Sequence, residues 1–250
     1  MPRLTSSSSL PWVKTLVLLL VGLSSSAQAI LTIDDFDTFS FLTVSGPPAG
    51  PMSNFASYTT AQALGGERDA MISRLSSNSG AVSMDISGSV ASQLSYASAP
   101  FTSGSLFLSY DGVDGVSAFN PTGLGGIDIT QSGSNTGIFL RSTSDLGAEL
   151  TFTIYSTADF VSTVTIPIAA DPTFTFTDYF MPFSTFTSIG SLGGADFANV
   201  GAITLFLDGS TPGTDVSLET VIASATPVPE PGGSFLVAMA GFVALRRRRA

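Results

Sequence analysis

The stretch ELTFTIY, residues 149–155, alternates apolar and polar side chains almost without interruption. Because successive side chains of a β-strand point to opposite faces, this pattern predicts a strand with one face in a hydrophobic core. The stretch VSTVTIPI, residues 161–168, follows a short interval later and is rich in β-branched residues, which favour strands. These two segments indicate a β-sheet protein.

Similar segments lie on both sides of this pair, separated by turns rich in Gly, Asn and Asp. No long 3.6-residue periodicity interrupts them, so we predict an all-β fold: an antiparallel β-sandwich of the jelly-roll type over residues 30–226. Residues 71–75 and 81–87 flank the turn Asn78-Ser79-Gly80 and are expected to form a hairpin, whereas 56–64 predicts a short turn of helix or an irregular segment. Residues 30–44 are expected to hold a first strand and then a second. The other expected strands are 105–110, 126–130, 136–142, 172–176, 199–207 and 214–223.

Residues 1–29 have the pattern of a secretory signal peptide. Arg3 and Lys14 supply positive charge, TLVLLLVGL (15–23) is apolar but too short to span a membrane, and Ala27 and Ala29 form an A-x-A cleavage site. We therefore predict an exported protein whose mature chain begins at Ile30.

Residues 227–250 form a second segment outside the predicted domain. The apolar part, 234–245, would extend roughly 18 Å as a helix, which is short of a hydrocarbon core of about 30 Å. A proline-rich motif precedes it, and a basic cluster that would stay on the cytoplasmic side follows it. The motif consists of Val228, Pro229, Glu230 and Pro231, and the basic cluster of Arg246, Arg247, Arg248 and Arg249.

This tail resembles the PEP-CTERM sorting signal of bacterial exported proteins. The resemblance implies an exosortase-type membrane protease as partner, transient membrane contact through the tail, and delivery to the cell envelope, outer surface or an extracellular matrix that contains exopolysaccharide. Gly232-Gly233 leaves open processing by a rhomboid-like protease. An ordinary C-terminal anchor is the third alternative.

Composition excludes several kinds of site. The chain contains no cysteine and no histidine, which rules out disulfides, His/Cys zinc sites and triads with a histidine base. Between residues 30 and 226 there are three arginines and 18 acidic residues, a net charge of −15. Such a surface repels nucleic acid, so no nucleic-acid partner is expected.

The order of local features in the predicted domain is similar to galactose-binding-like β-sandwiches, a group of carbohydrate-binding modules. These modules often end on a strand with an Asp-Asp or Asp-Asn pair, whereas Glu219-Thr220 occupies that place here. The resemblance implies the fold and a glycan ligand. The segments that carry it are 33–36, 65–69, 110–112, 136–140, 183–186, 196–207 and 215–219.

Carboxylates are the abundant reactive groups, and two sets are candidate calcium ligands. Asp111 and Asp114 lie in the stretch DGVDG (111–115), which has the oxygen spacing of a small calcium loop but also reads as two Asp-Gly turns. The second set would converge around one structural Ca²⁺ if the first and last strands were neighbours. It comprises Asp34, Asp35, Asp215 and Glu219.

The aromatic residues of the predicted domain are mostly phenylalanines, which at alternating strand positions usually belong to a core. Four tyrosines are expected in or near loops, where they would stack on a sugar. These are Tyr58, Tyr96, Tyr110 and Tyr179.

We assign no catalytic residue and expect a non-enzymatic exported protein with a structural or adhesive role linked to exopolysaccharide or a biofilm. The alternative is a secreted carbohydrate-binding module. A more remote one is a glycoside hydrolase with two carboxylates, which 18 acidic residues neither support nor exclude.

Overall fold

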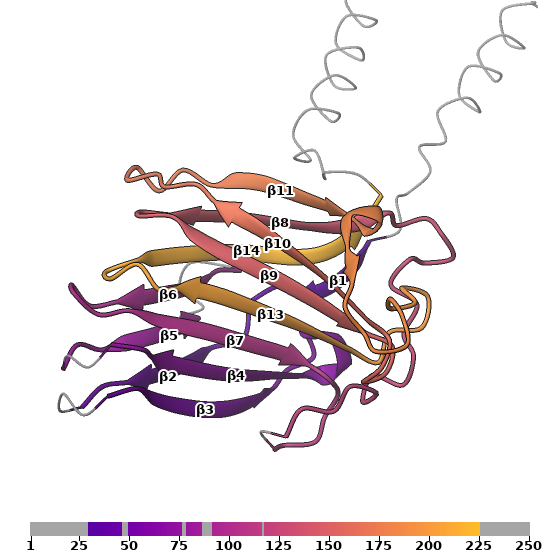
Figure 1. Ribbon diagram of the computed structural model, residues 1–250, viewed down its shortest axis with the longest axis horizontal. Helices are drawn as coiled ribbons and strands as arrows, with labels where there is room; N and C mark the ends of the chain where they lie inside the picture. The colour runs from indigo at the N-terminus through magenta and orange to yellow at the C-terminus, as the bar shows by residue number, and fades with distance from the viewer. Residues whose placement is uncertain (1–29, 47–49, 77–78, 87–91, 117, 226–250) are drawn as a thin grey trace, which may run out of the picture.

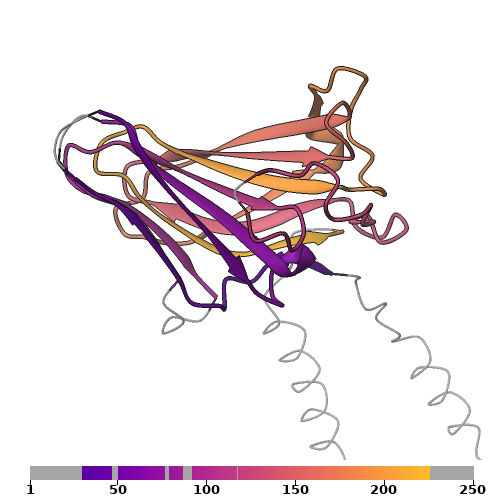
Figure 2. The ribbon, with the colours of Figure 1, turned by 90° about the horizontal axis from the view of Figure 1, so that it is seen from below.

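Two antiparallel sheets of seven strands each make up the part of the chain that the computed structural model describes, residues 30–46, 50–76, 79–86, 92–116 and 118–225. The sheets are stacked as two layers (Figures 1 and 2). The chain passes repeatedly from one sheet to the other, as it does in a jelly roll. The predicted all-β antiparallel sandwich is therefore confirmed.

The first sheet has the order β11-β8-β14-β6-β5-β2, with β1 paired to β14. A short 3-10 turn, η2 (Phe183–Thr185), follows its strand β11. The strands of this sheet are β1 (Leu31–Asp34), β2 (Ser40–Val44), β5 (Val82–Ile86), β6 (Leu94–Ser98), β8 (Gly137–Ser144), β11 (Thr177–Pro182) and β14 (Asp215–Ser224).

The second sheet has the order β12-β10-β9-β13-β7-β4-β3. Figure 1 shows β10, β9, β13, β7, β4 and β3 side by side from top to bottom. The 3-10 turn η1 (Leu64–Gly66) joins β3 to β4. The strands are β3 (Met52–Thr59), β4 (Glu67–Arg74), β7 (Gly104–Tyr110), β9 (Ala148–Tyr155), β10 (Val161–Ile168), β12 (Thr187–Ser188) and β13 (Ala202–Gly209).

The hydrophobic core fills the space between the sheets. On β9, the stretch 149–155 buries Leu150, Phe152 and Ile154 completely, while the residues between them face outward. The adjacent strand β10 pairs with β9 over its whole length. The alternation in the sequence therefore sets which face of each strand packs inward, and the opposite face of the second sheet is left for other contacts.

The predicted hairpin of residues 71–75 and 81–87 is wrong, although both segments are strands. β4 lies in the second sheet between β7 and β3, and β5 lies in the first sheet between β6 and β2. Each strand packs its apolar face against the core from the opposite side, so that Ile72 and Met84 are both fully buried. Local alternation does not reveal to which sheet a strand belongs.

Three other segments differ from expectation. Residues 172–176, expected as a strand, form a turn and an irregular segment before β11 begins at Thr177. Residues 52–59 form the strand β3, although 56–64 predicted a short turn of helix or an irregular segment. β3 is an edge strand that pairs only with β4 in the described sheet, and it shows no alternation because it buries little. Residues 126–130 do not form a strand; Ile127 makes an isolated bridge to Val200.

Candidate functional site

Four carboxylates gather at one end of the outer face of the second sheet. Glu67 and Asp69 lie on β4, two positions apart, so they project from the same face. Asp69 is paired with Ser109 on the antiparallel neighbour β7, and Asp111 and Asp114 follow that strand in the next loop. Carboxylate oxygens of Glu67, Asp69 and Asp114 all lie within 4.8 Å of one another. We call Glu67, Asp69, Asp111 and Asp114 the acidic cluster.

Hydrogen bonds orient the carboxylates of Glu67 and Asp111 within the acidic cluster. Glu67 Oε1 accepts hydrogen bonds from the Ser57 hydroxyl and from the backbone N of Gly115, the latter at 3.0 Å. Asp111 Oδ2 accepts one from the backbone N of Asn120 at 2.6 Å. Each of these carboxylates is thus held by one oxygen while the other oxygen stays available.

Three buried oxygens of the cluster have no hydrogen-bond partner. They belong to side chains that are nearly inaccessible: Glu67 is 1% exposed, Asp111 2% and Asp69 4%. Asp114 is exposed, and its Oδ1 accepts a hydrogen bond from the backbone N of Val116 at 2.9 Å. The unpartnered atoms are Glu67 Oε2, Asp69 Oδ1 and Asp111 Oδ1.

The crowding of negative charge changes the acidity of these groups. Burial, and then the charges of Asp111, Glu67 and Asp114, raise the pKa of Asp69 to about 7. Burial and the charge of Asp114 also raise the pKa of Asp111. Like charges in a poorly solvated place favour the protonated form.

A glycine makes the turn after Asp111 geometrically feasible. Gly112 has φ +92°, and a Cβ there would lie 2.6 Å from the carbonyl oxygen of Gly123. Only glycine fits such a left-handed conformation against another backbone segment. This turn lets Asp111 and Asp114 both reach β4.

An apolar row crosses the same face beside the acidic cluster. Phe55 of β3 pairs with Met71 of β4, Met71 with Phe107 of β7, and Phe107 with Phe206 of β13. Met71 is 39% and Phe206 38% exposed. We call these four residues the phenylalanine row. Side chains at such directly paired positions are neighbours across the strands.

Polar rows flank the phenylalanine row on both sides. A pocket of about 270 Å³ joins the row to the acidic cluster, lined by Phe55, Asp69, Met71, Phe107, Ser109 and Phe119. On the other side, Asp208 of β13 pairs with Glu149 of β9, and both line a second pocket of about 420 Å³. The face therefore combines apolar surface with hydroxyl and carboxylate groups.

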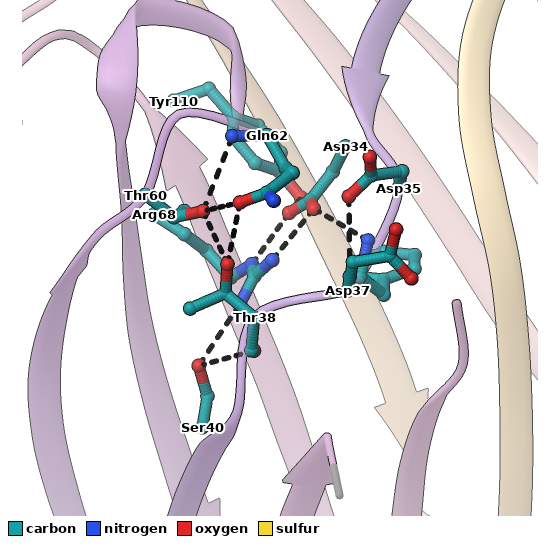
Figure 3. Close-up of polar contacts among 10 residues, drawn as sticks. Asp34, Asp35, Asp37, Thr38, Ser40, Thr60, Gln62, Arg68 and Tyr110 are labelled. Atoms are coloured by element: carbon teal, nitrogen blue, oxygen red, sulfur yellow. Dashed lines mark hydrogen bonds and ion pairs between the residues drawn. The ribbon is translucent and has the colours of Figure 1, made fainter. Parts of the chain in front are cut away.

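Arg68, between Glu67 and Asp69 in sequence, points the opposite way, into the sandwich. Its Nε and Nη2 donate to the two carboxylate oxygens of Asp34 at 2.5 and 2.6 Å, and its Nη1 donates to the hydroxyl of Ser40 at 3.1 Å (Figure 3). Tyr110 donates its hydroxyl to Asp34 Oδ2 at 2.9 Å. Burial, and then the Asp34 charge, raise the pKa of Tyr110 well above its ordinary value, so this donor keeps its proton.

The predicted calcium set of Asp34, Asp35, Asp215 and Glu219 does not converge, although β1 and β14 are indeed neighbours. Asp34 forms an ion pair with Arg68, and Asp35 Oδ1 accepts a hydrogen bond from the backbone N of Asp37 at 3.1 Å (Figure 3).

The other two members of that set lie on β14 with partners of their own. Glu219 pairs with Arg141 at 3.1 Å, and Asp215 Oδ1 accepts a hydrogen bond from the backbone N of Ser98 at 3.3 Å. The expected convergence is therefore wrong, because Asp34 lies opposite Val221 in the register of β1 and β14, far along the strand from Asp215. The partners of the four acids lie on β4, β6 and β8 and in the loop after β1.

The four tyrosines proposed for sugar stacking are also placed differently from expectation. Tyr96 and Tyr110 are buried in the core, and Tyr179 is half-buried on β11. Tyr58 lies on β3 and donates its hydroxyl to the carbonyl of Phe41 at 2.7 Å. On the outer face of the second sheet, the aromatic side chains are mainly phenylalanines, which the sequence pattern predicts to be core residues, together with Tyr155 of β9.

The predicted processing sites lie outside the described residues. No helix in the described ranges is both long and apolar enough to cross a membrane. The sites concerned are Ala27, Ala29, Val228, Pro229, Glu230, Pro231, Arg246, Arg247, Arg248 and Arg249.

No protein-family model and no curated protein matches this sequence. Among solved structures, the chain is similar to the Family 11 carbohydrate-binding module from Clostridium thermocellum in complex with a β-1,3-1,4-mixed-linked tetrasaccharide (14% identity, 81% of this chain, 100% of that chain, TM-score 0.39). It is also similar to a family 29 carbohydrate-binding module, with 10% identity over 79% of this chain and 88% of that chain and a TM-score of 0.35. An exo-β-agarase matches over 80% of this chain and 25% of its own, with 11% identity and a TM-score of 0.40. The likeness is distant and concerns the fold.

Proposed function

We propose that this chain is an exported, non-catalytic carbohydrate-binding protein that takes a glycan along the outer face of its second sheet. The observation that carries the proposal is the phenylalanine row. Its four residues cross adjacent strands that are spaced about 4.8 Å apart, so the row extends roughly 14 Å. This length suits several sugar rings of a linear chain.

The chemistry of the face supports this ligand class. The apolar faces of sugar rings pack on aromatic side chains, and binding sites are typically apolar with a few well-placed polar groups. Glu149 and Asp208 line the pocket on one side of the row and are available to sugar hydroxyls. On the other side, Asp69 and Ser109 form the polar wall of the pocket but are each only 4% exposed.

Charge narrows the ligand to a neutral glycan. The three arginines between residues 30 and 226 lie away from the phenylalanine row: Arg68 and Arg74 are buried, and Arg141 is on β8 of the first sheet. An acidic polysaccharide would meet the carboxylates of this face, among them Glu149 and Asp208, and no accessible cation there.

The sequence patterns of the flanking segments support an activity outside the cell. The PEP-CTERM-like tail supports sorting by an exosortase-type protease, with transient membrane contact, to the envelope or an exopolysaccharide matrix. Glycan binding there would provide the structural or adhesive role that the sequence suggested.

The test is affinity gel electrophoresis of the full chain against neutral and acidic polysaccharides of different linkages. We expect saturable retardation by one linkage class of neutral glycan, with no release of reducing ends. Retention equal for all polysaccharides would favour a nonspecific matrix protein, release of reducing ends a hydrolase, and absence of retention would overturn the proposal.

A further inference from the structure

We infer that the acidic cluster, Glu67, Asp69, Asp111 and Asp114, is a calcium site. This inference is independent of the proposed glycan ligand, because it rests on the cluster alone. It also differs from the calcium set expected around β1 and β14, since Glu67 and Asp69 come from β4.

The first argument is the unsatisfied hydrogen-bonding capacity. Glu67, Asp69 and Asp111 are each at least nine-tenths buried, and each keeps one oxygen without a hydrogen-bond partner. Buried polar atoms are nearly always paired, and an unpaired buried carboxylate is costly. A cation bound by Glu67, Asp69 and Asp114 would satisfy the first two carboxylates, and Asp111, whose side chain contacts that of Asp69, would complete the set.

The second argument is the distribution of positive charge. Arg68 is bound to Asp34, and Arg141 forms ion pairs with Asp178 and Glu219, so these guanidinium groups are engaged elsewhere. The donors that do reach the cluster are the Ser57 hydroxyl and backbone N–H groups, which carry no full charge. A bound divalent cation would supply the missing positive charge.

The third argument is the geometry. The carboxylate oxygens of Glu67, Asp69 and Asp114 lie within 4.8 Å of one another, and the Asp111 side chain contacts that of Asp69. Ca²⁺ binds oxygens at about 2.3–2.6 Å, so ligands across its shell are up to roughly 5 Å apart. Mg²⁺ loses its water reluctantly and demands octahedral geometry, which suits a buried, dehydrated set less well.

The competing explanation is a proton shared between Asp69 and Asp111. It also pairs two buried carboxyl groups, but it needs no metal. The two explanations differ in one measurement: a shared proton responds to pH alone, whereas a cation site responds to added calcium at constant pH.

The experiment is calorimetric titration of the full chain with CaCl₂ after chelation, together with its thermal unfolding in EDTA and in CaCl₂. We expect one Ca²⁺ per chain, with a dissociation constant in the range of about 0.1–1 mM that extracellular modules show, and a higher melting temperature in calcium. Asp69→Asn should weaken binding at least tenfold. In EDTA this variant should melt at a temperature no lower than that of the wild type, because the substitution removes charge repulsion. Such a melting temperature would also show that the variant folds.

Asp208→Asn is the matched control, since it makes the same charge change on the same face outside the cluster and should bind calcium normally. Glu67→Gln is the second test variant. The inference is overturned if the wild type binds no calcium, if Asp69→Asn and Glu67→Gln both bind as the wild type does, or if only pH shifts the melting temperature.

Discussion

Arg68 and Asp34 form a two-point ion pair in the interior of the sandwich, with both side chains inaccessible to solvent. The pair joins β4 of the second sheet to β1 of the first sheet, so it ties the two layers together. It also fixes the direction of β4: with Arg68 inward, Glu67 and Asp69 face outward.

Asp34→Ala should destabilise the protein by about 3–5 kcal/mol, because it leaves the Arg68 guanidinium buried without its counter-charge. Asp178→Ala, which breaks the exposed pair with Arg141, should cost about 1 kcal/mol or less. Urea unfolding of both variants measures the difference. Equal losses of stability would contradict the structural role given to the buried pair.

Phe107→Ala and Phe206→Ala should each weaken glycan binding roughly tenfold or more, since each removes about 1.5 kcal/mol of apolar contact with the sugar rings. The control is Phe41→Ala, because Phe41 is 52% exposed on β2 of the first sheet. Affinity electrophoresis compares the three variants with the wild type. If Phe41→Ala has the larger effect, the glycan binds the other sheet.

Removal of calcium should weaken glycan binding severalfold, because Asp69 belongs to both the acidic cluster and the pocket at the phenylalanine row. Asp111→Asn is the informative variant, since Asp111 belongs to the cluster but does not line that pocket. Its glycan affinity should be reduced and insensitive to EDTA. Unchanged affinity of the wild type in EDTA would show that the two sites act separately.

Asp215→Asn should change how stability depends on pH. Burial and the charge of Asp145 raise the pKa of Asp215 above 3.8. The folded state therefore holds this proton more tightly, and the resulting stabilisation is present below the ordinary pKa and lost as pH rises through the raised one. The stability of Asp215→Asn relative to wild type should thus increase with pH over that window.

Unfolding in urea at a series of pH values measures this difference. The stability of Asp145→Asn relative to wild type should also increase with pH, because this substitution removes the charge that raises the pKa of Asp215. A difference that is flat with pH for both variants would contradict the assignment.

The intact mass of the protein recovered from cells and from medium tests export and sorting. We expect a chain that begins at Ile30 and ends near Glu230. Retention of Arg246 to Arg249 would instead indicate an uncleaved anchor, and retention of Arg3 would contradict the signal peptide.

The strand pattern could be predicted wherever a strand buries one face. Residues 161–168 coincide with β10, and 149–155 differ from β9 by one residue, because every second side chain there meets the core. β3 was missed because an edge strand buries little, and 126–130 were overpredicted because local alternation cannot show whether a partner strand is in reach.

The candidate site could be predicted only in part. The sequence shows Asp111 and Asp114 as a short acidic loop. Glu67 and Asp69 belong to the segment 65–69 that carries the resemblance, but nothing along the chain places them beside that loop. The phenylalanines of the row are predicted to be core residues because a period-2 pattern does not show which of the two faces of a strand is buried. The sequence alone thus determined the fold class and the charge, and it predicts the flanking signals, since these depend on composition and on neighbours along the chain. The tertiary structure decided strand pairing, and with it the outward side of β4 and the meeting of β3, β4, β7 and β13, because register depends on how the whole core packs.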